Sequence, residues 1–126
     1  LEDEIWNRIR IDHKSLPEGV IKIVPALFHS RLTHIPVGVH TATASKRNEG
    51  TAIVYELVYS ENSRKVAIRF EQLFPHRILG WTESWVEKGK TVETAATLDK
   101  TIFTDYWTKN KNEFLYLRDS LNLPHF

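Results

Sequence analysis

The sequence contains neither cysteine nor methionine. The absence of cysteine excludes a disulfide framework and a thiolate metal site. The absence of methionine agrees with a processed or trimmed first residue, and an exported protein whose signal has been removed is one expectation. The sequence does not determine the compartment.

Excess charge of one sign and long hydrophobic runs are also lacking. Lysine and arginine total 17 against 16 acidic residues, which leaves a formal net charge of +1, and the basic residues are dispersed along the chain. This balance gives no reason to expect nucleic acid or an anionic membrane as partner. No apolar run approaches the roughly 18 residues of a transmembrane helix, so we expect a soluble chain without a membrane span.

What the chain does contain is typical of one folded domain. Its 126 residues are 41% hydrophobic and 26% charged, with four tryptophans. This length is enough for a single hydrophobic core, and we treat residues 1–126 as one domain. We find no phosphate-binding loop, dinucleotide fingerprint or zinc-protease motif, and therefore predict neither a cofactor nor a metal.

Periodicity predicts an α+β fold built on an antiparallel meander. Residues 1–11 have the apolar stripe of a short amphipathic helix. Alternating stretches separated by turn residues predict four strands, at 51–60, 65–74, 77–86 and 91–99. Residues 20–45 could add one or two strands. The stretch after residue 100 predicts C-terminal helices, which we expect to pack on the aromatic face of the sheet.

The turns predict which side chains share that face. Three turn positions, each chosen from local sequence, bring the same alternating set of residues to one side. The predicted cross-strand rows are Tyr59–Val66–Trp85–Val92, Leu57–Ile68–Glu83–Thr94, Tyr55–Phe70–Trp81–Ala96 and Ile53–Gln72–Leu79–Leu98. The opposite side of the sheet is mostly polar, as expected for a sheet with one buried face.

Glu83 is the unusual member of the apolar face, because it lies between Trp81 and Trp85. A carboxylate in such a place needs hydrogen-bond donors, access to water, or a proton taken up through a raised pKa. One interpretation is structural: Glu83 bonds Thr94 and a donor on a C-terminal helix, such as Tyr106, Trp107 or Arg118, or the sheet curves and water reaches the carboxylate. The other is a ligand site, since polar groups in an apolar concavity are typical of one.

Three histidines lie close together in "FHSRLTHIPVGVH", at 29, 34 and 40. Their spacing matches neither the helical nor the strand pattern of metal ligands, so we interpret them as loop or strand-edge residues. His40 faces the apolar side in one of two possible registers. His76, in a tight connection, is either solvated or an acid/base group at the rim of the sheet.

Three hypotheses for function follow. The preferred one is a small-molecule or glycan-binding module, with a pocket on the concave face. Its ligand-binding residues would be Glu83, Trp81, Trp85, Tyr55, Gln72 and Thr94. The second is a small cofactor-independent hydrolase, lyase or isomerase. In this enzyme Glu83 would act with His40 or His76 as acid and base, its pKa raised. The third is a structural or interaction protein without a pocket. The sequence predicts neither the ligand nor the oligomeric state.

Overall fold

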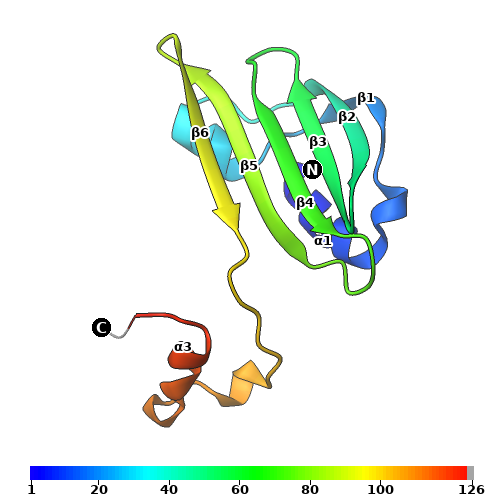
Figure 1. Cartoon of the computed structure of the whole chain (residues 1–126). Helices are drawn as coiled ribbons and strands as arrows, with labels where there is room; N and C mark the ends of the chain where they lie inside the picture. The colour runs from blue at the N-terminus through cyan, green and yellow to red at the C-terminus, as the bar shows by residue number, and fades with distance from the viewer. Residues whose placement is uncertain (125–126) are drawn as a thin grey trace.

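The computed structural model describes residues 1–124, and the fold is a six-stranded antiparallel meander with short helices (Figure 1). The strands are β1 (Gly19–Ile23), β2 (His40–Glu49), β3 (Ala52–Tyr59), β4 (Lys65–Glu71), β5 (Ile78–Glu87) and β6 (Lys90–Thr97). The α-helices are α1 (Glu2–Asp12), α2 (Leu27–Thr33) and α3 (Tyr116–Ser120). Single 3-10 turns lie at His13–Ser15, Tyr106–Thr108 and Asn112–Phe114.

The strands follow one another in the sheet in sequence order, which confirms the predicted meander. The region left open by the sequence, 20–45, supplies β1 and most of β2, with α2 between them. Strands β5 and β6 have the predicted register, with Trp85 opposite Val92 and Trp81 opposite Ala96. Lys88 and Gly89 both have positive φ in the turn that joins them, as a type I′ hairpin requires.

Two of the predicted registers are wrong by two residues. Leu57, not Tyr59, lies opposite Val66, because residues 60–64 form a longer connection than the predicted two-residue turn. Val66 in turn lies opposite Glu83, and an irregularity at Arg69 and Phe70 shifts the register further along. A slip of two residues keeps side chains on their faces, because side chains alternate with a period of two. Beyond the irregularity the β4–β5 register is offset by one further residue, so Ile78, and not the predicted Leu79, packs against the core.

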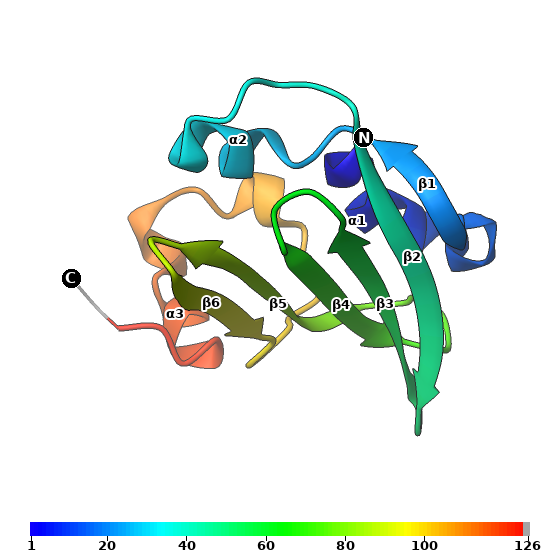
Figure 2. The same cartoon turned by 90° about the horizontal axis from the view of Figure 1, so that it is seen from above.

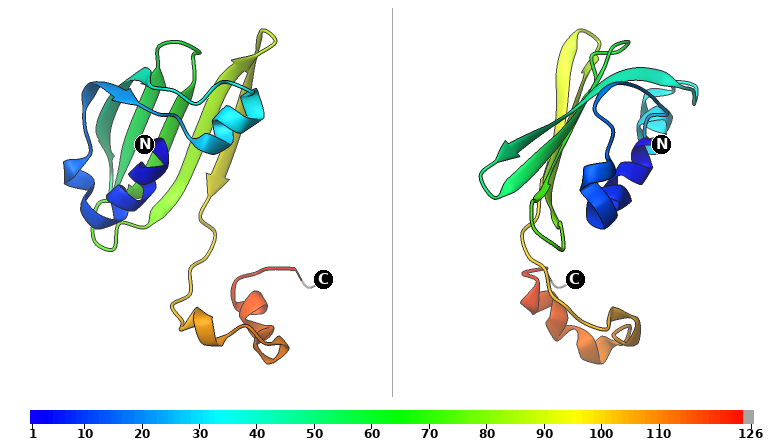
Figure 3. Two further views of the ribbon diagram at one scale, coloured as in Figure 1. Left: turned by 180° about the vertical axis from the view of Figure 1, so that it is seen from behind. Right: turned by 90° about the vertical axis from the view of Figure 1, so that its right-hand side faces the viewer.

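The part of the predicted apolar face on β3 and β4 forms the core of the protein. The predicted members on the β6 side, Thr94, Ala96 and Leu98, are exposed. The buried members from β3 and β4 are Ile53, Tyr55, Leu57, Tyr59, Val66, Ile68 and Phe70. Helix α1 lies across this face, as Figure 3 shows, and buries Ile5 and Ile9 against it. The Trp6 ring meets Trp81 edge to face, with centroids 6.3 Å apart. Burying each isoleucine contributes about 1.5–3 kcal/mol.

The C-terminal helices do not occupy the place predicted for them on the aromatic face. The chain leaves β6 and extends beyond the end of the sheet, where α3 and the two 3-10 turns lie (Figures 1 and 3). None of the described residues after β6 belongs to the hydrophobic core cluster. Helix α1 takes the position instead, and α2 lies over the β5 side of the same face (Figure 2).

Candidate functional site

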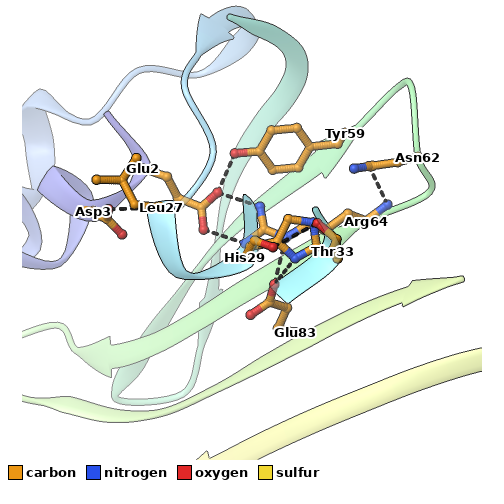
Figure 4. Close-up of polar contacts among 9 residues, drawn as sticks. All are labelled: Glu2, Asp3, Leu27, His29, Thr33, Tyr59, Asn62, Arg64 and Glu83. Carbon is orange, nitrogen blue, oxygen red and sulfur yellow. Dashed lines mark hydrogen bonds and ion pairs between the residues drawn. The ribbon is translucent and has the colours of Figure 1, made fainter. Parts of the chain in front are cut away.

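The carboxylate of Glu83 is neutralised by a buried guanidinium, that of Arg64. Arg64 comes from the connection between β3 and β4, and its side chain is fully buried (Figure 4). Its Nε donates to Glu83 Oε1 at 2.7 Å. Its two terminal nitrogens donate to the two carboxylate oxygens of Glu2 in α1, at 2.5 and 2.7 Å. The Tyr59 hydroxyl also donates to Glu2. The Arg64 guanidinium thus links helix α1 to strand β5.

The environment of Glu83 keeps it ionised. Burial acts to raise the pKa of its carboxyl, but the hydrogen bonds and charges of His29 and Arg64 outweigh burial and lower the pKa below its ordinary value. The enzyme hypothesis predicts a raised pKa for Glu83, and this prediction is wrong. The donors that the structural interpretation placed on a C-terminal helix come instead from Arg64 and from α2.

His29 is the partner of Glu83 that the sequence did not single out. It lies in α2, is 5% exposed, and places Nδ1 3.1 Å from Glu83 Oε1. The imidazole also meets the Trp85 ring edge to face, with centroids 5.7 Å apart. Its other nitrogen, Nε2, is buried without a hydrogen-bond partner among the described residues. Buried polar atoms are rarely left unpaired, so Nε2 calls for an explanation.

A pocket of about 540 Å³ opens between α2 and the end of β5, and we call it the α2–β5 pocket. Its volume is within the range of small-molecule sites. It is lined by His29, Leu32, Thr33, His34, Ile35, Asn62, Trp85, Val86, Glu87 and Lys88. Glu83 does not line it, so the carboxylate acts on this pocket only by holding the His29 ring.

The other predicted binding residues do not gather at this pocket. Tyr55 is fully buried, and its hydroxyl donates to the Pro17 carbonyl at 2.8 Å. Trp81 packs on Trp6 of α1. Thr94 lies opposite Glu83 in the sheet. Of the six predicted binding residues, Trp85 lines the α2–β5 pocket and Glu83 contacts it indirectly, through His29.

Gln72 and the two histidines proposed as acid/base groups have other neighbours. Gln72 borders two shallow pockets beside His13, at the opposite end of α1 from Glu2. His40 pairs with the Glu61 carboxylate. His76 contacts the Glu71 carbonyl through Nδ1 at 3.2 Å and meets the His13 ring edge to face. The histidine that lies beside Glu83 is therefore His29, and not His40 or His76.

No sequence signal identified His29, because its role depends on α2 folding back over β5. Within residues 1–124, no group of three or more His, Asp or Glu side chains is arranged to hold a metal ion. The described helices include none that is both long and apolar enough to cross a membrane. We found no match to this chain among protein-family models, curated proteins or solved structures.

Proposed function

We propose that this protein is a small-molecule-binding domain whose ligand occupies the α2–β5 pocket. One observation carries the proposal: the His29 ring is fixed by Glu83 at Nδ1, while its buried Nε2 has no partner and the ring itself lines the pocket. A fixed polar group in a mostly apolar concavity is the usual means of orienting a small ligand.

The walls of the pocket suit a ligand with a flat or apolar face. Trp85 offers an indole surface, and Leu32 and Ile35 supply aliphatic contacts. Asn62 and Lys88 add polar groups at the boundary. A sugar ring or a phenol combines an apolar face with hydroxyl groups that can bond an imidazole nitrogen. Because neighbouring atoms cover Nε2, such a ligand must displace α2 slightly from β5 to reach it.

Tryptophan fluorescence during titration with methyl glycosides and simple phenols tests this proposal. We expect a saturable change with at least one of these probes. Trp85→Leu should weaken binding by about two- to tenfold, since a lost aromatic contact is worth about 0.5–1.5 kcal/mol. Trp107→Phe is the matched control, because Trp107 is 68% exposed and lies in the C-terminal segment; this variant should keep the affinity of the parent. Titrations that do not depend on residue 85 would contradict the pocket.

A second candidate function is acid/base catalysis in the same pocket. It is favoured by the hydrogen-bonding distance between the Glu83 carboxylate and the His29 imidazole. His29 would then be the base and Glu83 the positioning residue, since the lowered pKa of Glu83 makes it a poor acid. Turnover of any bound probe that is lost in His29→Gln, while binding is retained, would separate catalysis from binding alone.

A further inference from the structure

Strand β6 is an unpaired edge of the sheet. It pairs with β5 on one side, and Figures 1 and 2 show no strand on its other side. Natural edge strands are usually protected by proline, by a bulge or by several charges. Between Thr91 and Thr97, β6 has no proline, no register shift against β5, and a single charged residue, Glu93.

The backbone groups that face outward can be identified from one hydrogen bond. The Leu98 N–H donates to the Leu79 carbonyl at 2.8 Å, so residue 98 bonds inward, toward β5. Bonding direction alternates along an antiparallel strand, which makes 92, 94 and 96 inward-bonding as well. The outward-bonding residues are Thr91, Glu93, Ala95 and Thr97.

We propose that β6 pairs antiparallel with β6 of a second copy of this chain, about a two-fold axis at Thr94. In this register every outward-bonding residue meets another, because 91 lies opposite 97 and 93 lies opposite 95. The pairing would form about eight backbone hydrogen bonds, two for each of the four facing pairs. A contact related by a two-fold axis closes on itself, so the assembly stops at a dimer.

The side chains of β6 are compatible with this register. Val92 would lie opposite the partner's Ala96, and both continue apolar rows of the concave face, behind Trp85 and Trp81. Glu93 would lie opposite the partner's Ala95, so the two glutamates do not face each other. Uncharged cross-strand pairs avoid the cost of directly opposed like charges.

In this register, a positive and a negative side chain at position 95 should have opposite effects on the stability of the dimer. Ala95→Arg would place a guanidinium opposite Glu93 twice in the dimer, and Ala95→Glu would place two like-charge pairs there. By sedimentation velocity over a range of concentrations, we expect a dimer whose dissociation constant falls about fivefold with Arg and rises about fivefold with Glu, at roughly 0.2–1 kcal/mol per pair. Thr82→Arg and Thr82→Glu are matched controls, since Thr82 is the exposed neighbour of Ala95 on a strand paired on both sides.

Amide exchange measured by NMR provides a second readout on the unmodified protein. We expect the amides of Ala95 and Thr97 to be protected at concentrations where the dimer forms and to exchange rapidly on dilution. The amides of Thr94 and Ala96 should be protected at both concentrations. A monomer at all concentrations, or a dimer whose stability responds equally to the two Ala95 variants, would overturn the proposal.

Discussion

At the residue scale, Glu83 shows how a carboxylate is kept in an apolar face. Its oxygen accepts from Arg64, which is itself neutralised by Glu2, and lies beside His29 on the other side. Hydrogen bonds between ionised groups are shorter and stronger than neutral ones. Removing one member leaves the others buried without a partner, which is costly.

Glu83→Gln should therefore destabilise the protein at neutral pH. A hydrogen bond to a charged group contributes about 1.5–3 kcal/mol, and the amide keeps only part of it. The pKa of Glu83 is lower in the folded protein than its ordinary value of 4.5. Its contribution is thus present above pH 4.5 and is lost as the pH falls through the lower folded-state pKa. Urea unfolding from pH 7 to pH 3 should show the parent curve converging on that of the variant.

Glu71→Gln is the matched control for this measurement. Glu71 also pairs with an arginine, Arg77, at 2.6 Å, and its pKa is also lowered by that arginine. The two carboxylates are about equally exposed, but Arg77 is 47% exposed whereas Arg64 is buried. Solvent therefore screens the Glu71 pair, and we expect little change in the free energy of unfolding. Equal losses in the two variants would show that burial of Arg64 adds nothing to the ion pair with Glu83.

At the element scale, strands β5 and β6 approach each other so closely at Gly80 that there is no room for a larger side chain. A Cβ at Gly80 would lie 2.6 Å from the Ala96 carbonyl oxygen, which is backbone and belongs to the neighbouring strand. Glycine at 80 therefore lets β5 bend past β6 beside the register irregularity at Arg69 and Phe70. The same strand carries Glu83 and Trp85, the residues of the proposed binding arrangement.

Gly80→Ala should destabilise the protein by about 1–3 kcal/mol, the usual cost of forcing atoms into filled space. Gly38→Ala is the control, because a Cβ there meets no atom closer than 4.0 Å and the backbone has no positive φ. The control should be as stable as the parent, or slightly more stable through the reduced entropy of its unfolded chain. Thermal unfolding followed by circular dichroism measures both variants, and equal melting temperatures would refute the close approach.

At the scale of the whole molecule, the core and the C-terminal segment are separate. The core is formed by α1 and the inner face of the sheet. The segment after β6 exposes large apolar side chains, among them Phe103, Tyr106 and Trp107. Apolar side chains stabilise a fold in proportion to the area that they remove from water, so these exposed side chains contribute little.

Truncation at either end should consequently have unequal effects. Removal of residues 101–126 should leave the free energy of unfolding nearly unchanged, because none of the described residues of this segment, 101–124, belongs to the core cluster. Removal of residues 1–12 should prevent folding, since it deletes Ile5, Ile9 and the Glu2 carboxylate that pairs with Arg64. Denaturant unfolding compares the two, and a large loss from the C-terminal truncation would contradict this division of the chain.

Local patterns determined much of the fold. Alternation with a period of two placed Tyr55, Leu57, Ile68 and Phe70 on one face, and that assignment survived two register errors because both were slips of two residues. The Lys88–Gly89 turn needs positive φ at both central positions, a requirement met within the turn itself. Such features depend on neighbours in the chain and can be predicted from the sequence.

Only the tertiary structure decided which elements cover the apolar face and which groups neutralise Glu83. In the sequence Arg64 is a turn residue and His29 one of several loop histidines, and their roles arise when α1 and α2 fold onto the sheet from far along the chain. Helices at either end of the chain can cover an apolar face, and periodicity does not distinguish them. The choice depends on packing and charge pairing between distant segments, which local sequence does not specify.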